Sequence, residues 1–378
     1  MNILETTCFN LGSEGGVTSN LRTLYKGLKA LGNNVIIEGG SRSYFDGLLA
    51  LLKYRRVDDR SRTYYFLRRL DRQANKIINI LKNHKIDIVN CHDVAICRYL
   101  LDKINLPIIL TIHGPFSREI EMSNLGETLY HNAIKQFERL CFKSDKLIYI
   151  AVDQGQKDIL ITDFNVPSDK IFVIHNCVET SLFIPKDRKN KEKYLILPRR
   201  LVKKNGCHVA ISAMKHVDEG IKLLVAGNGP EREMLMNLAK EIGVKERVVF
   251  LGEVKNKKMI NLIANSVAVL IPSIPSHGVV EASSIAMLEG MSAGRPVIGS
   301  AIGGIKEIMK DGETGILVEP ESAESLAKAI SWVLNNSKEA EELGQRARDY
   351  VIKNFSMHER AKKYQDVYLM AIRKNNIK

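Results

Sequence analysis

The amino-acid sequence predicts an α/β protein with two doubly wound parallel sheets. Short, continuous Val/Ile/Leu runs of strand length recur along its 378 residues, which indicates strands that are covered on both faces. Helical stretches separate these runs, and this alternation is typical of a parallel sheet with helices on both sides. The pattern occurs twice and the chain is long enough for two cores, so we predict two Rossmann-like domains.

The first half begins with a strand at residues 1–9 ("MNILETTCF"). Residues 15–32 then form a Gly-rich loop and a helix that ends at Gly32. The further strands expected in this half are residues 33–40, 86–93, 106–114, 145–153 and 170–178. Each of these runs ends in polar or Gly residues, which is typical of strands that lead into loops.

The second half repeats the pattern and closes on a helix. Its expected strands are residues 193–201, 221–229, 247–254, 267–274 and 295–302. The stretch "FSMHERAKKYQDVYLMAIRK" is helical and has no strand after it. The charged, Pro-containing residues 182–195 are the least core-like of the chain. We therefore expect domains at residues 1–188 and 189–355, followed by a helix at 356–378.

The charge of the chain favours anionic partners. There are 56 basic and 43 acidic residues, a formal net charge of +13. Residues 41–76 hold ten Lys or Arg and four Asp or Glu, with Leu, Phe and Tyr between them. Such a basic, amphipathic segment can lie on an acidic membrane surface. The same composition also suits a solvated helical hairpin whose arginines snorkel.

Several classes are disfavoured. No run of 18 apolar residues occurs, and the N-terminus lacks the basic region of a signal peptide. The six cysteines are scattered without metal-ligand spacing, so we expect buried thiols. We therefore expect a cytoplasmic protein, for which residues 41–76 offer a means of lying at the inner face of the membrane.

Groups for chemistry should follow the strands, because ligands of open parallel sheets bind beyond the carboxyl ends of the strands. Gly15 and Gly16 precede the first helix and can offer backbone N–H groups to a phosphate or sugar oxygen. A plain Gly-rich turn explains them equally well. His113 ends another strand, where it can donate to a ligand hydroxyl or act as a base, or can simply be a satisfied structural histidine.

Two loops of the second half suit a nucleotide. Arg199, Arg200, Lys203 and Lys204 cluster at the head of a helix, where cations suit a diphosphate or form a solvated basic face. In "GNGPERE", Gly227 and Gly229 let the backbone approach whatever lies above, and Pro230 is expected in the first turn of a helix. Arg232 occupies the third Gly position of a dinucleotide fingerprint, which argues against that fold.

Glu281 and Glu289 lie in "HGVVEASSIAMLEGMSAGRPVIGSAIGG", a stretch that otherwise resembles a buried helix. On one helix they would be about 12 Å apart along the axis, too far to act on one atom as an acid/base pair. They could hold two hydroxyl-bearing groups. Between them Ser283, Ser284 and Ile285 would begin the helix, and their N–H groups would face the phosphates. A solvent-facing and a capping glutamate are the alternative interpretation.

Together these stretches resemble the glycosyltransferase family 4 group of GT-B enzymes over nearly the whole chain. "PRRLVKKNG" is similar to the family's Gly-Arg-Leu…Lys-Gly block, and "AGNGPER" to its Gly-x-Gly-Pro block. "EASSIAMLEGMSAGRPVIGSAIGG" resembles the block of two glutamates, and "GGVTSNLRTLYKGLKALGNNV", "TIHGPF" and "VIHNCVE" match more loosely. The resemblance implies a GT-B fold with an interdomain cleft. It implies transfer of a hexose-type sugar from a nucleotide diphosphate sugar to an acceptor hydroxyl, with retention.

The resemblance also implies residue roles. Glu281 would contact the donor sugar, Glu289 would bind the ribose, and His113 would bond the sugar or help to close the site. The diphosphate would be held by Arg200, Lys204, Asn205, Gly16, Ser283, Ser284 and Ile285. The base pocket would comprise Gly227, Asn228, Gly229, Pro230 and Val254, and the Gly15–Gly16 loop would approach the phosphate and sugar. No bound metal or cofactor is implied, since the nucleotide sugar, with UDP or GDP expected, is a substrate. A glycan, a lipid-linked or a small molecule would be the acceptor, and nucleic acid is not expected.

Two positions depart from the family's pattern. Asn205 stands where Lys usually precedes the Gly, here Gly206, and Arg199 replaces a usual Gly. Lys204 is long enough to reach the same phosphate, or Asn205 could donate a neutral hydrogen bond to it. The exact contacts to the diphosphate therefore stay open.

No side chain of the sequence is an obvious nucleophile, so we expect the leaving phosphate itself to take the acceptor's proton. Three other functions are alternatives. A nucleotide-sugar epimerase of the same fold would need acid/base groups around the sugar. A nicotinamide-dependent oxidoreductase is disfavoured by the missing third Gly of its fingerprint. A non-enzymatic binder of anionic glycans or lipids would use residues 41–76.

Overall fold

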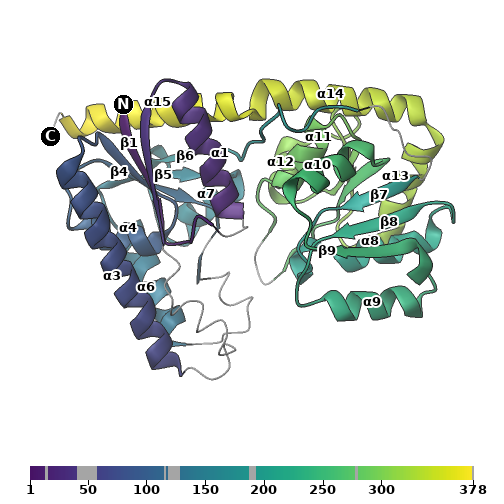
Figure 1. Cartoon of the computed structure of the whole chain (residues 1–378), viewed down its shortest axis with the longest axis horizontal. Helices are drawn as coiled ribbons and strands as arrows, with labels where there is room; N and C mark the ends of the chain where they lie inside the picture. The colour runs from purple at the N-terminus through teal and green to yellow at the C-terminus, as the bar shows by residue number, and fades with distance from the viewer. Residues whose placement is uncertain are drawn as a thin grey trace. The chain divides into compact units, whose positions relative to one another are not determined.

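The computed structural model describes residues 1–12, 16–40, 58–114, 116–117, 128–186, 193–276 and 280–376. The chain forms two compact units, Met1–His175 with Arg360–Lys378, and Asn176–Glu359 (Figure 1). The boundary expected at 188/189 lies outside the described residues. The second unit begins earlier, because the backbone of Val178 accepts from the N–H of Met357 and donates to the carbonyl of Phe355 within that unit.

The first unit is built on a six-stranded parallel sheet, as predicted. Its strand order is β2-β1-β3-β4-β5-β6, so β1 and β3 are neighbours from which the chain proceeds in opposite directions. Such a switch point opens a crevice at the carboxyl ends of the strands. The strands are β1 (Asn2–Thr7), β2 (Asn34–Gly39), β3 (Ile88–Cys91), β4 (Ile108–Ile112), β5 (Leu147–Ala151) and β6 (Ile171–Val173).

Helices cover both faces of the first sheet. One face packs against α1 (Gly16–Ala30) and α15 (Met357–Asn376), while α3 (Asp59–Asn83), α4 (Val94–Leu101), α6 (Leu129–Phe142) and α7 (Gln154–Thr162) contribute to the other core. Ile3 points into the first of these cores and Leu4 into the second, which is the period-two alternation of a strand. A short 3₁₀ helix, η1 (Ser168–Lys170), leads into β6.

The second unit repeats the architecture with strand order β12-β11-β10-β7-β8-β9, all parallel, and its switch point lies between β7 and β10. The strands are β7 (Tyr194–Leu197), β8 (Lys222–Ala226), β9 (Val248–Gly252), β10 (Ala268–Ile271), β11 (Val297–Ser300) and β12 (Ile316–Val318). The sequence did not predict β12. Its apolar run is confined to Ile316–Val318 between Gly315 and Glu319, whereas the run of the equally short β6 continues to Ile174.

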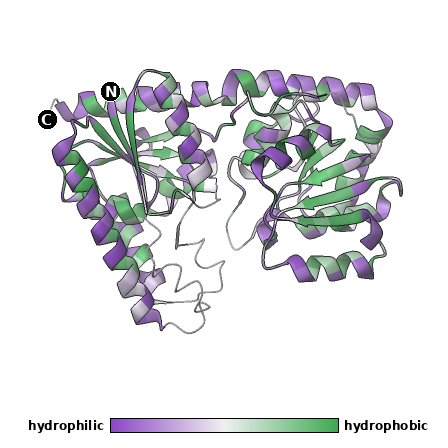
Figure 2. Cartoon of the chain, viewed as in Figure 1, coloured by the Kyte–Doolittle hydropathy of each residue, from purple (hydrophilic) through white to green (hydrophobic). Residues whose placement is uncertain are grey.

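The second sheet also carries helices on both faces. Helices α8 (Cys207–Ala213), α9 (Arg232–Glu241) and α13 (Ala323–Asn335) pack on one face, and α10 (Asn256–Asn265), α11 (Ile285–Ser292), α12 (Gly303–Ile308) and α14 (Ser337–Phe355) on the other. Three 3₁₀ turns connect them: η2 (Lys203–Asn205), η3 (Met214–His216) and η4 (Lys245–Arg247). The hydrophobic residues concentrate on the strands and on the helix faces that meet them (Figure 2).

The last helix belongs to the first unit for most of its length. Helix α15 begins at Met357, and its residues from Arg360 onward cluster with the first unit. Tyr364 and Tyr368 are fully buried there beside Ile3, Ile109 and Ile150. Burial of two aromatic rings anchors the helix to the sheet. In the part of the chain that the structure describes, no helix is long and apolar enough to cross a membrane.

Candidate functional site

Arg199 lies at the switch point of the second sheet. It follows β7, while Ser273 follows the neighbouring β10, and Nη2 of Arg199 donates to Oγ of Ser273 over 3.2 Å. The guanidinium thus joins the two loops that flank the crevice of the open sheet. This is the place where ligands of parallel sheets bind, as the sequence led us to expect.

The buried guanidinium of Arg199 organises three further groups. Nη1 donates to Oγ of Ser284 over 2.8 Å, and Nη2 donates to Oδ1 of Asn205 over 2.5 Å. Nη2 also forms an ion pair with Oε2 of Glu281 at 2.9 Å, with the two side chains only 8% and 12% exposed. A charge at such burial needs a partner and satisfied donors. Arg199 therefore fixes the loop that carries Glu281 and the start of α11.

The predicted phosphate-binding cations lie on the outer side of this arrangement. Arg200 is exposed and Lys204 is half-buried, so both side chains remain accessible. Asn205 is buried, and its amide donates to the carbonyl of Arg200 over 2.7 Å while its oxygen accepts from Arg199. The side chain of Asn205 is thus committed to the loop itself, which favours a structural role over direct phosphate binding.

The glycines of "AGNGPER" make a close approach, but to a protein loop. A Cβ on Gly227 would lie 2.0 Å from the carbonyl oxygen of Arg199, and one on Gly229 would lie 2.2 Å from that of Leu201. The backbones also bond, since the N–H of Leu201 donates to the carbonyl of Asn228. No side chain fits at either glycine, so the β8–α9 loop is held against the β7–α8 loop.

The remaining positions expected to line the base pocket lie in or near that loop. Asn228 and Pro230 are exposed, and Val254 is partly buried against the core of the unit. Pro230 does not open the helix as expected. Helix α9 begins at Arg232 with Glu231 as its N-cap residue, because the turn at Pro230 precedes the helix.

Glu281 and Glu289 do not share one helix. Helix α11 begins at Ile285 with Ser284 at its N-cap, so Glu281 lies in the extended segment that precedes it. The axial spacing that we estimated for one continuous helix therefore does not apply. The reason is backbone packing. A Cβ on Gly303 would lie 2.3 Å from the carbonyl oxygen of Glu281, and the N–H of Gly304 donates to that oxygen.

The segment before α11 has a second anchor at the start of the unit. The backbone N–H of Asn176 donates to Oγ of Ser283 over 3.0 Å, and its side-chain amide donates to the carbonyl of Ser283 over 2.8 Å. Both residues are buried. Residues 281–284 are therefore held from one side by Arg199 and from another by Asn176.

Glu289 is half-buried in the second turn of α11. Unlike Glu281, it has no ion-pair partner among the described residues. Across the described ranges of the chain, its carboxylate has neither a hydrogen bond nor an ion pair. Burial raises the pKa of Glu289 to about 7, because desolvation penalises the charged form. A carboxylate kept at this cost and left unpaired is suited to accept hydrogen bonds from a ligand.

The first turn of α11 is also open. Ser284 makes no side-chain capping bond, since its Oγ accepts from Arg199 instead. The first N–H groups of a helix have no intrahelical acceptor, and the helix dipole favours an anion there. The predicted contacts of Ser283, Ser284 and Ile285 thus belong to one end of one helix.

In the first unit, Gly16 is the first residue of α1, and Gly15 lies outside the described residues. A Cβ on Gly16 would meet nothing within 4 Å, so packing does not require glycine there. His113 follows β4 at the carboxyl edge of the sheet, and its pKa is held well below the usual value by burial and by the neighbouring His92 and Arg360. The ring is therefore neutral at physiological pH.

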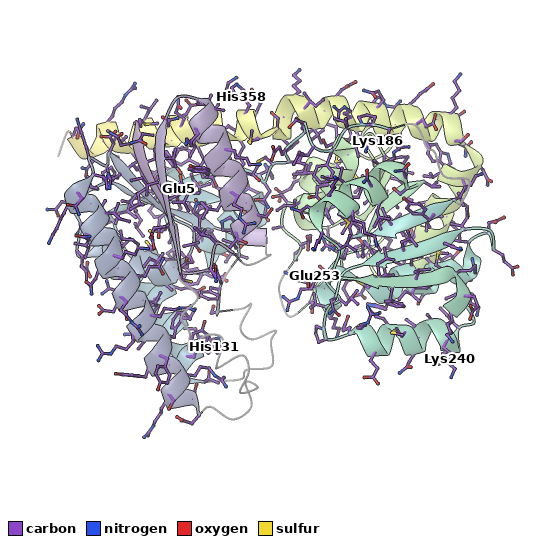
Figure 3. All side chains as sticks on the ribbon, in the orientation of Figure 1. Glu5, His131, Lys186, Lys240, Glu253 and His358 are labelled. Atoms are coloured by element: carbon purple, nitrogen blue, oxygen red, sulfur yellow. The ribbon has the colours of Figure 1, made fainter. Side chains whose placement is uncertain are left out.

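His113 is one end of a chain of side chains that the sequence did not reveal. Its Nε2 lies 3.1 Å from Nδ1 of His92, and Nε2 of His92 lies 2.7 Å from Oε2 of Glu5. Glu5 is fully buried on β1 (Figure 3). A carboxylate in a central strand was the one signal that could have pointed to this group. Within the described residues, no three or more His, Cys, Asp or Glu side chains are arranged so that they could hold one metal ion together.

The two halves of the chain match two family descriptions. Residues 14–182 match "Glycosyltransferase Family 4", and residues 179–350 match "Glycosyl transferases group 1". An uncharacterized glycosyltransferase of Methanocaldococcus jannaschii is 28% identical over 319 residues, 79% of either chain. The N-acetyl-alpha-D-glucosaminyl L-malate synthase of Bacillus anthracis is 25% identical over 317 residues, again 79% of either chain.

Solved structures share the fold. Sucrose-phosphate synthase from Thermosynechococcus elongatus superposes with a TM-score of 0.79 at 17% identity, covering 98% of this chain and 99% of that one. HepE of Anabaena in complex with UDP superposes with a TM-score of 0.72 at 17% identity, covering 97% and 99%. Three observations support one assignment: the family matches, the two parallel sheets, and the sequence blocks at the carboxyl edges of those sheets. The chain belongs to the family 4 glycosyltransferases and is a glycosyltransferase with the GT-B fold.

Proposed function

We propose that the protein transfers a hexose-type sugar, with retention, from a nucleotide diphosphate sugar to an acceptor hydroxyl. The observation that carries the proposal is the half-buried Glu289, whose carboxylate is unpaired within the described residues and has a pKa raised to about 7. A pair of vicinal hydroxyls, as in a ribose, can donate two hydrogen bonds to such a group and so offset its desolvation.

The diphosphate would lie at the start of α11. The uncapped N–H groups of Ser284 and Ile285, together with the helix dipole, favour an anion there. Arg200 and Lys204 are accessible on the neighbouring loop and would neutralise its charge. Asn205 would act indirectly, by holding Arg199 and the carbonyl of Arg200.

The base and the sugar would extend to opposite sides of the diphosphate. Exposed Asn228 and Pro230, with Gly227, Gly229 and Val254, would contact the base, for which uracil or guanine is proposed. Glu281 would contact the transferred sugar. Its ion pair with Arg199 supports this role, because the pairing fixes the carboxylate in one place before the substrate arrives.

The first unit would act on the sugar through His113 and through the Gly15–Gly16 loop. Gly16 begins α1 and has open space where a side chain would project, which suits the approach of a ligand's phosphate or sugar. His113 is a neutral ring whose Nδ1 has no partner among the described residues, and it would exchange a hydrogen bond with a sugar hydroxyl.

The chemical step would use the donor's own phosphate as the base. The C–O bond to the leaving diphosphate breaks with its electron pair, the acceptor oxygen bonds to the anomeric carbon on the same face, and the leaving phosphate takes the acceptor's proton. Fixed dipoles and cations at α11 would stabilise the growing negative charge. A glycosyl adduct trapped on Glu281 or on another side chain would exclude this step.

A screen of nucleotides tests the donor site first. The protein is heated with UDP, GDP and ADP, and a ligand at 100 times its dissociation constant adds about 2.7 kcal/mol to stability. A stabilising nucleotide then identifies the sugar donors to assay, with and without a chelator, since we propose that no metal or other cofactor is needed. Release of nucleotide diphosphate with retained anomeric configuration supports the proposal. An isomerised nucleotide sugar without acceptor would support an epimerase instead.

The acceptor would be a glycan, a lipid-linked or a small polar molecule. An acidic membrane surface is the favoured location, because α3 displays exposed Tyr64 and Tyr65 with the guanidinium of Arg68 5.5 Å from the ring of Tyr64. Aromatic and basic side chains together suit a lipid headgroup region. Residues 41–57 of the basic segment lie outside the described residues. Co-sedimentation with anionic but not with neutral vesicles would support this location.

A further inference from the structure

The hydrogen-bonded series Glu5–His92–His113 lies within the first unit. The proposed function gives a role to His113 but none to Glu5 or His92. Glu5 and His92 have side chains with no exposure, 2.7 Å apart. They come from neighbouring strands, since Glu5 of β1 is in register with Asn90 of β3 and His92 follows that strand. A carboxylate in the interior of a sheet must be fully satisfied to be tolerated.

The donors around Glu5 fix the direction of each hydrogen bond. Tyr368 of α15 donates its hydroxyl hydrogen to Oε1 of Glu5 over 2.6 Å. The amide of Asn90 donates to Oε2 of Glu5 over 2.9 Å and to the hydroxyl of Tyr368 over 2.8 Å. Thr111 donates to Oδ1 of Asn90 over 2.9 Å, and this bond fixes which end of the Asn90 side chain faces Glu5. Glu5 is therefore an acceptor toward each of these neighbours.

This order propagates through the two rings. Nδ2 of Asn90 also lies 3.1 Å from Nε2 of His92, but its two hydrogens are directed to Oε2 of Glu5 and to the hydroxyl of Tyr368. Because Glu5 accepts, Nε2 of His92 therefore carries the hydrogen of the 2.7 Å bond. In an uncharged ring Nδ1 of His92 is then a lone pair, so Nε2 of His113 must donate to it over 3.1 Å. That leaves Nδ1 of His113 as the only lone pair at the end of the chain. It has no partner within the residues that the structure describes.

We propose that Glu5 and His92 are positioning residues that hold His113 in its Nε2–H tautomer, so that Nδ1 accepts a hydrogen bond from a hydroxyl of the sugar substrate. The inference rests on the proposed function for the identity of that hydroxyl. A small cavity of about 40 Å³ lies beside the rings, lined by Phe9, Val17, His113 and Phe116 among others. This volume admits a hydroxyl group and is too small for a whole sugar.

The arrangement also explains why His113 stays neutral. Burial, His92 and Arg360 all lower the pKa of His113. The rings stack with centroids 5.4 Å apart, so a charge on one would be felt by the other. A neutral, oriented acceptor can select a hydroxyl without carrying a charge into the site.

Nitrogen NMR of the histidine rings tests the inference in the intact chain without any substrate. At pH 7 we expect His113 and His92 to carry their hydrogens on Nε2 and to have bare Nδ1 atoms. A hydrogen on Nδ1 of His113 would overturn the proposal. The two proposals can fail separately. If the tautomer is as expected but no nucleotide binds and no sugar is transferred, the proposed function is wrong while the positioning of His113 by Glu5 and His92 still holds.

Two matched variants separate positioning from mere packing. Glu5→Gln keeps the shape of the side chain but replaces one acceptor oxygen by an NH2 donor. Nε2 of His92 then no longer has to carry the hydrogen. Tyr368→Phe removes the other bond to Glu5 but leaves the path to His113 intact. We expect Glu5→Gln to mix the tautomers of His113 and to lower kcat roughly tenfold, the equivalent of one lost hydrogen bond, with nucleotide affinity unchanged. Tyr368→Phe should change only stability. Equal effects of both on kcat, with the tautomer unmoved, would show a purely structural role.

Discussion

Arg199 donates a 2.5 Å hydrogen bond from Nη2 to Oδ1 of Asn205, so the two positions at which the chain departs from the family's pattern touch one another. The pattern has Gly at the first position and Lys at the second. In this chain the cation is at the first position, Arg199, which follows β7, and the second position holds the neutral Asn205. The same guanidinium forms an ion pair with Glu281 at 2.9 Å, so a change at residue 199 also affects the loop before α11.

This contact predicts that the two residues compensate. Arg199→Gly should leave Glu281 poorly paired at 12% exposure and destabilise the fold by about 3–5 kcal/mol. Asn205→Lys alone should bring a second cation against the guanidinium and also destabilise. The double variant restores one cation, so it should be more stable than either single variant. Urea unfolding of the four proteins measures the coupling, and simple additivity of the two effects would refute compensation.

Glu289 predicts a pH-dependent affinity for the nucleotide. The carboxylate, not the acid, accepts two ribose hydrogen bonds, so binding should release a proton when the free group is protonated. Affinity should therefore rise with pH up to the free-state pKa of about 7 and level off above it. Calorimetry from pH 6 to 8 measures this. Glu289→Gln is the control, because phosphate ionisation affects both proteins and only the wild type should show the additional rise.

The same residue predicts a gain of stability on substitution. The pKa of Glu289 is raised from 4.5 to about 7 in the fold, so the wild type loses stability as pH rises through this window. Glu289→Gln has no such titration and should exceed the wild type at pH 8 by on the order of 1–3 kcal/mol. The difference should vanish near pH 4.5. Thermal unfolding at both pH values is the measurement, and an equal gap at both would argue against burial as the cause.

The two glutamates should differ in what they control. Glu289→Ala should weaken nucleotide binding more than Glu281→Ala, because Glu289 is the carboxylate left unpaired for the ribose. Glu281→Ala should lower turnover more, since the group proposed to touch the transferred sugar is lost. Dissociation constants and kcat of both variants decide the matter. Equal effects on both quantities would end the division of roles.

Gly16 offers a test in which the fold should not change. No atom of the described residues lies within 4 Å of a Cβ at Gly16, so Gly16→Ala should keep or slightly raise stability. If the loop approaches the donor's phosphate or sugar, the added methyl should nevertheless raise KM or lower kcat by about tenfold. Gly155→Ala, an exposed first-turn glycine of α7 in the same unit, is the matched control and should be silent. Unaltered kinetics in Gly16→Ala would remove this residue from the site.

Local sequence patterns were sufficient for the fold. Continuous Val/Ile/Leu runs predicted all of the strands in the first sheet and β7 to β11 of the second, because burial on both faces leaves a signal in each strand separately. Only β12 was missed, because its apolar run stops after three residues at Glu319. The matching blocks likewise predicted Arg200, Glu281 and Glu289 for the nucleotide-sugar site, and their roles there stay predictions.

Only the tertiary structure decided how the side chains are used. Arg199 read as one more exposed cation, yet it is buried and joins Ser273, Ser284, Asn205 and Glu281. The sequence predicted a helix start at residues 283–285, and α11 begins at Ile285, but only the fold shows that Gly303 and Gly304 pack against the backbone of Glu281 before it. Glu5 and His92 are 87 positions apart in sequence and 2.7 Å apart in the fold. Periodicity records which face of an element is buried, whereas these partnerships arise from strand register and loop packing between distant segments, which no local pattern encodes.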